Sequence, residues 1–371
     1  MAVPLLDFSR QHAALEAPLK EVFARVLDSG QFILGPEVEA FEQEVAAYLE
    51  VPHALGVSSG TDALTLAMMA LGIEPGDEVL CPVFTFFGTA GCIARLGAVP
   101  VWVDVREDTF NIDLEDAARK VSKRTRAIVP VHLFGQPCDM QCVVAFAQSH
   151  NLWVLEDAAQ AIGARYKGEP VGGFGNCGAF SFYPTKNLGG FGDGGLLTSR
   201  DSDFTERARR LRNHGMHPKY FHSDIGGNFR LDALQAALLR VKLPHLESYH
   251  AARRAHAAFY NAQLSGLEGV SLPHVRSEVE SVWNQYTIRV PDGRRDELRR
   301  HLSAHGIGTE IYYPVALHEQ VCFRNMGRGG ESIRVGSALA ASVISLPVFP
   351  EMTDRERAEV VSAVRSFSEG S

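Results

Sequence analysis

The sequence contains no long uninterrupted hydrophobic run. Its longest uncharged apolar stretch, Val79 to Ala94, is interrupted by Pro82, Gly88 and Gly91. It is also shorter than the ~20 residues that a membrane-spanning helix requires. The opening residues, MAVPLLDFSRQ, lack the apolar core of a signal peptide. We therefore expect a soluble cytoplasmic protein that does not enter membranes.

An excess of positive charge is also missing, because 44 acidic residues outnumber 36 basic ones and give a net charge of −8. Such a protein has no general attraction to nucleic acid, so we expect no nucleic-acid partner. An anionic substrate would need a local basic pocket. The six cysteines should stay reduced in a chain without an export signal. The spacing of His132, Cys138 and Cys142 matches no zinc site, so we expect no metal.

The chain nevertheless has enough apolar residues, 46% of 371, to bury a large core. Strand-like runs alternate with amphipathic segments, which predicts an α/β protein with a mostly parallel sheet flanked by helices. We expect a large domain over residues 1–245 and a smaller C-terminal α+β domain over residues 246–371, which includes the linking helices. The predicted strands are Ala54–Val57, Glu78–Cys81, Val99–Val103, Ala127–Val131, Leu152–Leu155, Ala179–Tyr183, Gln285–Val290 and Gly308–Tyr313. The predicted helices include Asp113–Val121, Met140–His150, Arg230–Leu264 with a break near Pro244, and Arg295–His305.

One lysine, Lys186, lies in an unusual segment, CGAFSFYPTKNLGGFGDGG. The predicted strand before it ends at Pro184, and the glycines after it prevent a regular helix. A lysine on such a turn can be partly desolvated, which lowers its pKa and makes its amine nucleophilic. A surface lysine on a glycine loop is the ordinary alternative.

A carboxylate follows the predicted strand within LWVLEDAAQAIG. Glu156, Asp157 and Gln160 lie at its carboxyl end, where open α/β sheets bind ligands. A carboxylate there, together with a desolvated lysine, suits pyridoxal phosphate, whose pyridinium nitrogen pairs with an acid. A cap on the following turn is the alternative role for Asp157.

An anion site is predicted at the start of another helix. Leu64, Met68 and Leu71 have helical spacing, so a helix should begin near Gly60. Free backbone N–H groups at Gly60 and Thr61 would then face an anion. A dinucleotide motif at Gly173, Gly175 and Gly178 is rejected, since these glycines precede a strand and do not open a helix.

Together these segments resemble the DegT/DnrJ/EryC1/StrS sugar aminotransferases, a branch of the fold-type I pyridoxal-phosphate enzymes. The resemblance runs through almost the whole chain and implies their fold. Histidine replaces the lysine in the dehydratases of this family, and Lys186 argues against that branch. The matching segments are PLLDFSRQ, GQFILGPEVEAFE, SSGTDAL, PVFTFFGTAG, EDAAQAIGA, SFYPTKNLGGFGDGG, NFRLDALQAA, WNQYTIR, YYPVALH and SLPVFP.

The resemblance implies roles around pyridoxal 5′-phosphate. Lys186 would form the Schiff base and move protons, Asp157 would hold the pyridine nitrogen, and Gln160 would hydrogen-bond the phenolic oxygen. Phe86 would stack on the ring, although core packing is its ordinary alternative. The residues expected to hold the phosphate are Gly60, Thr61 and Ser181.

The resemblance also implies a homodimer with shared active sites, because Asn228 matches a residue that reaches the phosphate from the partner subunit. A cap on its own helix is the alternative. Tyr312 stands where many relatives carry histidine, so no role is carried over to it. The residues expected to bind the substrate are Arg230, Tyr313, Lys219 and His318.

Three segments, GQFILGP, NQYTIR and HGMHPKYFH, look most like members that act on 3-keto sugars. We therefore expect an aminotransferase that converts a nucleotide-linked keto-hexose, such as a UDP-2-acetamido-3-keto sugar, to an amino sugar for a surface glycolipid or polysaccharide. L-Glutamate would be the amino donor, leaving pyridoxamine 5′-phosphate and 2-oxoglutarate. A 4-keto sugar is one alternative substrate. A regulatory protein that binds pyridoxal phosphate without turnover is the alternative function.

Overall fold

A seven-stranded sheet forms the centre of the molecule, which a computed structural model describes over residues 2–369. Its strands are β1 (His53–Val57), β2 (Glu78–Pro82), β3 (Val99–Val103), β4 (Thr125–Ile128), β5 (Trp153–Asp157), β8 (Cys177–Ser181) and β9 (Gly195–Ser199). Their order is β1-β9-β8-β5-β4-β2-β3, and β9 runs antiparallel to both of its neighbours. The other described neighbours pair in parallel, which confirms the mostly parallel sheet.

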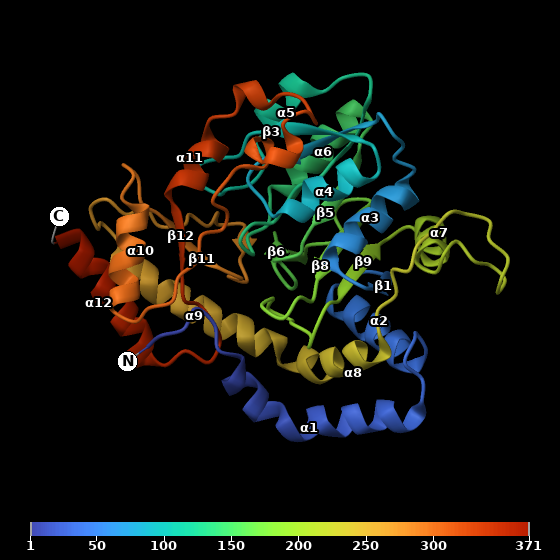
Figure 1. Cartoon of the computed structure of the whole chain (residues 1–371), viewed down its shortest axis with the longest axis horizontal. Coiled ribbons are helices and arrows are strands. Elements are labelled where there is room, and N and C mark those ends of the chain that lie inside the picture. Colours follow the sequence, from blue (N-terminus) through green and yellow to red (C-terminus); the bar gives the residue numbers. More distant parts are fainter. Residues whose placement is uncertain (1, 370–371) are drawn as a thin grey trace.

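Helices cover both faces of this sheet (Figure 1). Because successive strand residues point to opposite faces, Phe180 of β8 packs in one buried cluster and Ala179 in another. The helices of this part are α1 (Phe8–Ser29), α2 (Pro36–Tyr48), α3 (Gly60–Leu71), α4 (Phe87–Arg95), α5 (Leu114–Lys120), α6 (Met140–His150), α7 (Ser202–Arg212) and α8 (Ala233–Lys242).

The C-terminal part has its own buried cluster, which includes Tyr260, Tyr286 and Leu346. Val3 joins this cluster and forms a bridge to Ile307, so the N-terminal segment lies against the C-terminal part (Figure 1). The boundary at residue 245 stays a prediction. The main elements here are α9 (Leu246–Leu264), β11 (Tyr286–Arg289), α10 (Arg295–Ala304), α11 (Val335–Ser342), β12 (Val343–Leu346) and α12 (Asp354–Glu369). The short elements of the whole described chain are β6 (Arg165–Tyr166), β7 (Glu169–Pro170), β10 (Val279–Glu280), η1 (Leu243–His245), η2 (Leu317–Glu319), η3 (Val321–Phe323) and η4 (Gly330–Ser332).

The sheet brings three chain segments to one edge. Asp157 pairs with Ala179, and Ser181 pairs with Gly195, which pairs in turn with Val57. The ends of β5, β8 and β1 therefore lie together, since parallel strands end at the same edge.

Two secondary-structure predictions need correction. No strand forms over 308–313, where Glu310 makes an isolated bridge to Ser345. Strand β9 was not predicted, because the glycines before it suggested a loop and its pairing with β1 and β8 is long-range. In residues 2–369, none of the helices combines the length and the apolar character of a bilayer span.

Candidate active site

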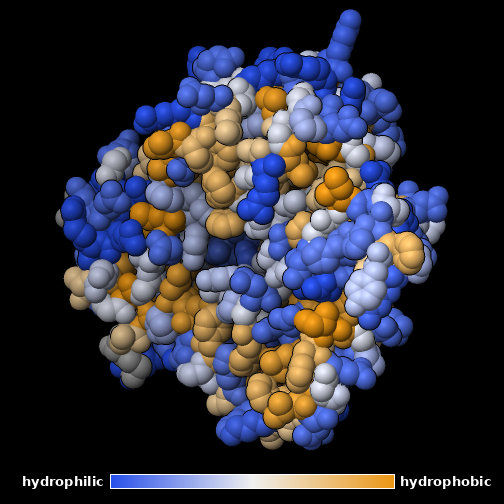
Figure 2. Space-filling view, turned by 45° about the vertical axis from the view of Figure 1, so that its right-hand side comes forward, coloured by the Kyte–Doolittle hydropathy of each residue, from blue (hydrophilic) through white to orange (hydrophobic). Residues whose placement is uncertain are grey.

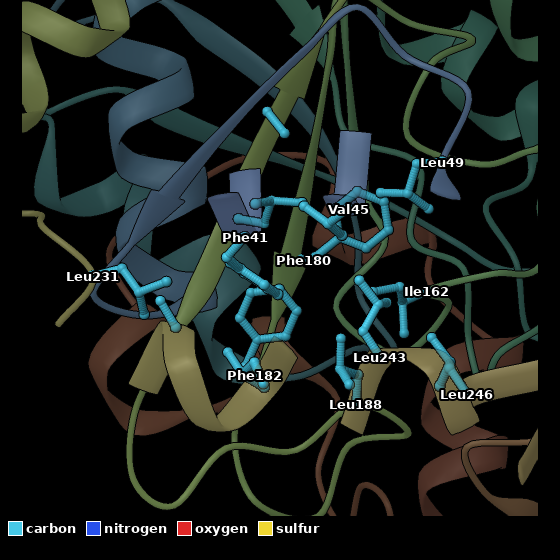
Figure 3. Close-up of a cluster of buried hydrophobic side chains, with 14 of the residues drawn as sticks. Phe41, Val45, Leu49, Ile162, Phe180, Phe182, Leu188, Leu231, Leu243 and Leu246 are labelled. Carbon is cyan, nitrogen blue, oxygen red and sulfur yellow. The ribbon is translucent and has the colours of Figure 1, made fainter. Parts of the chain in front are cut away.

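Lys186 is held between two buried anchors. Phe182 and Leu188, four residues before it and two after it, are both fully buried in the cluster drawn in Figure 3. The amide of Lys186 donates to the carbonyl of Tyr183 at 2.8 Å, which closes the turn. The side chain is partly buried, and burial lowers the pKa of its amine to about 8, opposed by the charge of Asp157. About a tenth of the amine is therefore neutral and nucleophilic at pH 7.

Asp157 is buried at the end of β5, with donors on both oxygens. Oδ2 accepts a hydrogen bond from Thr89 Oγ1 at 2.7 Å, and Oδ1 accepts one from the amide of Ala159 at 3.2 Å. Burial raises the pKa of this carboxyl, and these donors and the nearby Lys186 oppose the rise. Both alternatives for Asp157 are compatible with this geometry, because Oδ1 caps a turn while the carboxylate also lies near Lys186.

Gln160 and Tyr313 meet beside Asp157. The Gln160 Nε2 donates to the Tyr313 hydroxyl at 3.1 Å. Burial, with the nearby Asp157 charge, raises the pKa of Tyr313. Within residues 2–369, Gln160 Oε1 is buried and has no hydrogen-bond partner. An unpartnered buried amide oxygen is unfavourable unless a ligand or water satisfies it.

The predicted anion site has the expected local geometry. Helix α3 begins at Gly60, and Ser59 is its N-cap, accepting a hydrogen bond from the amide of Asp62 at 3.0 Å. A Cβ added at Gly60 would lie 2.8 Å from the Cβ of Ser181, so β8 passes directly against the start of the helix. Thr61 lies in the same first turn. The N–H groups of this turn and the Ser181 hydroxyl can therefore hold one anion.

Phe86 does not belong to the core. Its side chain is 56% exposed and it occupies the N-cap position of α4. Its ring centroid lies 6.1 Å from that of Tyr313. A Cβ at Gly88 would lie 3.1 Å from the Phe86 ring and 3.2 Å from the Thr61 hydroxyl oxygen, which places this ring near the anion site. The core-packing alternative for Phe86 is therefore wrong.

A hollow of about 700 Å³ adjoins the start of α3. Arg230 lines it and donates through Nη1 to Asn213 Oδ1 at 2.6 Å, while its Nε is buried without a partner in residues 2–369. Figure 2 shows a face of the molecule that is deeply hollowed, with hydrophilic and hydrophobic residues on the rim. The other polar and charged lining residues are Ser58, Ser59, Thr61, Asp62, Asp193, Asn228, Asp232 and Gln235.

Asn228 is exposed and does not cap a helix. Helix α8 begins at Ala233 with Asp232 as N-cap, so the predicted start at Arg230 is wrong. The backbone before Ala233 instead pairs with distant segments, since Arg230 bridges to Val57 and Asn228 to Asn213. The capping alternative for Asn228 is thereby excluded.

Two predicted substrate residues lie apart from this group within one chain. Lys219 is on an exposed loop, with its ammonium 5.1 Å from the Tyr220 ring centroid, and it does not line the hollow. His318 lies on η2, 3.6 Å from the Glu319 carboxylate, and burial lowers its pKa. Within residues 2–369, no hydrogen bond or ion pair joins either of them to Lys186 or Asp157.

The two rejected motifs have structural explanations. The amides of Gly172, Phe174 and Gly175 donate to Glu156 at 2.8–2.9 Å, so the glycine-rich stretch binds an internal carboxylate. His132 Nδ1 accepts from the Cys138 amide at 3.1 Å, and its Nε2 lies 3.3 Å from Glu156 Oε2. No His/Cys/Asp/Glu group suited to a metal occurs in residues 2–369.

Sequence reasoning missed Thr89. The available signal was its spacing, because Thr89 follows Phe86 by three residues at the start of α4 and so shares one helix face with it. Its hydroxyl reaches Asp157 across 68 residues of sequence, which no local pattern indicates.

Comparisons with known proteins agree on one family. The profile of the DegT/DnrJ/EryC1/StrS aminotransferase family matches residues 14–365. A dTDP-3-amino-3,4,6-trideoxy-alpha-D-glucose transaminase of Streptomyces venezuelae is 45% identical over 99% of this chain and 96% of its own. A UDP-N-acetyl-3-dehydro-alpha-D-glucosamine 3-aminotransferase of Acidithiobacillus ferrooxidans is 42% identical over 100% of this chain and 99% of its own. A relative from Geobacillus stearothermophilus, 45% identical over 99% of both chains, carries the name pleiotropic regulatory protein.

Solved structures agree with these relatives. DesV of S. venezuelae, crystallised in complex with a ketimine intermediate, is similar with a TM-score of 0.96 at 45% identity and covers 99% of both chains. NtdA of Bacillus subtilis, crystallised with its cofactor PMP, has a TM-score of 0.92 at 28% identity over 99% of this chain and 85% of its own. The expected fold-type I architecture is thus confirmed.

Proposed function

The chain belongs to the DegT/DnrJ/EryC1/StrS aminotransferase family and is a sugar aminotransferase that depends on pyridoxal 5′-phosphate, and we propose that it aminates a nucleotide-linked 3-keto hexose with L-glutamate as donor. The observation that carries this proposal is the position of Lys186, whose pKa is lowered to about 8, near the buried Asp157 at one edge of the sheet.

The residues at this edge suit the cofactor. When bound, pyridoxal phosphate supplies a carbonyl that bonds to amines and a ring that accepts electrons. Lys186 would bind its carbonyl carbon and Asp157 its ring nitrogen. Gln160, whose Nε2 donates to Tyr313 and whose Oε1 is unpartnered, would turn its Nε2 toward the phenolic oxygen, and the exposed Phe86 ring would cover one face of the ring. The phosphate would be held by Gly60, Thr61 and Ser181.

The chain's own residues would then move protons and keep charges in place. Nζ of Lys186 would accept the proton from the α-carbon of the donor and later donate a proton to C3 of the sugar. A group with a pKa of about 8 can do both near neutral pH, because both of its forms are populated. Asp157 would stay ionised through the donors on its oxygens and hold a positive charge opposite it.

The charges around the hollow support a nucleotide-linked substrate. The protein is net acidic, so a diphosphate needs local basic groups. Arg230 has an unpartnered buried Nε and lines the hollow beside the start of α3. We assign it, with Tyr313, to substrate binding. Lys219 and His318 stay proposed substrate residues, although they lie apart from this hollow within one chain. The names of the Streptomyces and Acidithiobacillus relatives both place nitrogen at C3 but differ in nucleotide, which supports a 3-keto sugar and leaves UDP and dTDP open.

A homodimer is part of the proposal. Four large apolar side chains on and just after α1 are exposed, namely Phe23, Leu27, Phe32 and Ile33. Ile33 also lines the hollow, so this apolar strip reaches the candidate site. A second copy packed on the strip would cover it and bring its own residues to the hollow. In that arrangement, Asn228 would bind the phosphate of the cofactor held by the partner subunit.

The regulatory alternative is favoured by the name of the Geobacillus relative. It differs from the proposal in one measurable respect, since a regulator that only binds pyridoxal phosphate does not consume an amino donor. An enzyme that acts on a 4-keto sugar would differ from the proposal only in its product, which would carry nitrogen at C4.

One experiment tests the proposal. The purified protein loaded with pyridoxal phosphate is mixed with L-glutamate, and the change of cofactor absorbance and the formation of 2-oxoglutarate are followed. The converted protein is then offered UDP- and dTDP-linked 3-keto and 4-keto hexoses, and the products are identified by mass and by NMR of the carbon that carries nitrogen. We expect amination at C3. Free keto-hexoses should react much more slowly, because the binding energy of the diphosphate is lost. Equal rates with free and nucleotide-linked sugars would refute the proposal, and no reaction with glutamate would favour the regulator.

A further inference from the structure

A buried arginine without an acidic partner lies beside the lysine segment. Arg253, on α9, is only 3% exposed. Its Nη1 donates to the carbonyl oxygens of Val348 at 2.6 Å and Trp283 at 3.1 Å. Its Nε is buried without a partner, and its Nη2 donates no hydrogen bond within residues 2–369. Two of the three guanidinium nitrogens are thus unused.

No carboxylate in the described residues forms an ion pair with this guanidinium. Glu351 acts on Arg253 only from beyond ion-pair distance. Burial lowers the pKa of Arg253 to about 10, so the group remains charged at neutral pH. A buried charge without a counter-charge is unfavourable, and an anion that neutralises it would be bound correspondingly well.

Arg253 lines a cavity of about 50 Å³ between the N-terminal segment and the C-terminal part. Thr185, which directly precedes Lys186, lies on its wall. The side-chain oxygens of Asn284 and Gln285 are also buried without partners in residues 2–369, so no hydrogen bond fixes these oxygens. The polar lining residues are Arg253, Thr185, Asn284, Gln285 and Tyr312.

We propose that this cavity binds a carboxylate of the amino donor and that Arg253 is the residue that recognises it. The inference rests on the proposed function, because it assigns a subsite to the donor. The Nε and Nη2 of a guanidinium point in the same direction and bind a carboxylate through two parallel hydrogen bonds. These are the two nitrogens that Arg253 leaves unused.

The size of the cavity restricts its ligand. A volume of about 50 Å³ admits one carboxylate or a few water molecules, but neither a hexose nor a diphosphate. The amides of Asn284 and Gln285 can donate to the same carboxylate. The sugar nucleotide would therefore occupy the hollow near α3, while the donor alone uses this cavity. Trapped water is the competing occupant. If water fills the cavity, the KM for the donor does not depend on the residues that line it.

Asn284→Asp tests this assignment with almost no change in shape. The new carboxylate would occupy the cavity as an internal anion beside Arg253. We expect the KM for L-glutamate in the first half-reaction to rise at least about tenfold, equivalent to about 1.4 kcal/mol. The KM for the nucleotide sugar in the second half-reaction should rise far less. The melting temperature should not fall, since Arg253 gains a partner.

A second readout does not depend on turnover. In wild type, 2-oxoglutarate should raise the melting temperature of the pyridoxal form, and in Asn284→Asp it should not. Asn261→Asp is the matched control, because it adds the same charge to α9 and keeps the acceptor for the Tyr286 hydroxyl at 2.6 Å. Its KM for glutamate should equal that of wild type.

The outcomes separate this inference from the proposed function. An unchanged KM for glutamate in folded Asn284→Asp, with 2-oxoglutarate still stabilising the protein, overturns the carboxylate subsite and leaves the aminotransferase intact. If Asn284→Asp does not fold, Gln285→Glu places an acid on the same cavity and carries the same expectation. A wild-type protein that reacts with no amino acid refutes the proposed function and the subsite together.

Discussion

Thr89 donates a hydrogen bond of 2.7 Å to Oδ2 of Asp157. The hydroxyl of Thr85 lies 3.2 Å from that of Thr89 and extends the chain of hydroxyl groups. Because the amide of Ala159 donates to Oδ1, both carboxylate oxygens are engaged by donors from different elements. The orientation of the carboxylate is thus fixed by the fold, and its ionised form is favoured against the effect of burial.

Replacing Thr89 with valine should weaken the charge on Asp157. The variant keeps the shape but removes the donor, so the pKa of Asp157 should rise further. Hydrogen bonds to charged groups contribute ~1.5–3 kcal/mol, which corresponds to an upward movement of the acid limb of the rate profile by about one to two pH units. Activity should recover as the pH rises, because the carboxylate ionises again. Thr89→Ser keeps the donor and should keep the wild-type profile. Identical profiles for the valine variant and wild type would exclude a positioning role.

The structure contains a control for the reactive lysine. Burial lowers the pKa of both Lys186 and Lys242 to about 8, but Lys242 donates to the carbonyl of Gly189 at 2.5 Å. Borohydride should fix the cofactor to Lys186 and not to Lys242, as peptide mapping would reveal. Lys186→Ala should lose almost all turnover, whereas Lys242→Met should affect stability first. An adduct at another lysine would end the assignment.

Asp157→Asn should separate cofactor binding from catalysis. The amide preserves the size of the side chain but carries no negative charge to hold the ring nitrogen protonated. We expect the cofactor to bind still, with kcat lower by a factor on the order of 10² or more. Steady-state rates, with cofactor content measured by absorbance, would check this. Near wild-type turnover in a fully loaded variant would contradict the role.

Local patterns predicted those parts of the site that depend on local structure. The start near Gly60 was predicted from helical spacing, and the helix does begin at Gly60. Helix α6 has the predicted bounds, Met140 and His150, because its apolar spacing is regular and Asp139 caps it. The end of β5 near Asp157 was found for a similar reason, since a short apolar run bounded by polar residues marks a buried strand.

Other parts depend on contacts between distant residues. Thr89 matters because of a carboxylate 68 positions away, and Arg253 stands out because no carboxylate within residues 2–369 forms an ion pair with it. The extent of β9 depends on its neighbours β1 and β8, and its preceding glycines concealed it. The start of α8 at Ala233 follows from a bridge between Arg230 and Val57 that helical spacing alone does not reveal.

The ionisation of Glu78 should make the stability of the fold depend on pH in the acid range. A hydrogen bond from Arg328, with others from Ser122 and Arg124, lowers the pKa of Glu78 to about 2, although burial opposes this. Since the folded pKa is below the ordinary value, its stabilisation is complete above pH ~4.5 and is lost as the pH falls through about 2. Glu78→Gln should lower the stability at pH 7 by ~1.5–3 kcal/mol and flatten the melting temperature between pH 5 and 2. The exposed Glu39→Gln should do neither, and an equal acid sensitivity in both variants would contradict the prediction.

The position of Asn228 leads to a test of assembly. It is exposed on the hollow that Ser59 and Thr61 of its own chain also line, so it could act on its own site or on that of a partner. Chains carrying Lys186→Ala are combined with chains carrying Asn228→Asp, which places a negative charge beside the phosphate. If Asn228 acts across the interface, one site of each mixed dimer receives both defects and the other receives neither. Activity should then return to as much as half of wild type per mixed dimer. If Asn228 acts within its own chain, each site keeps one defect and mixing restores nothing. A fully active monomer in sedimentation would refute the shared site outright.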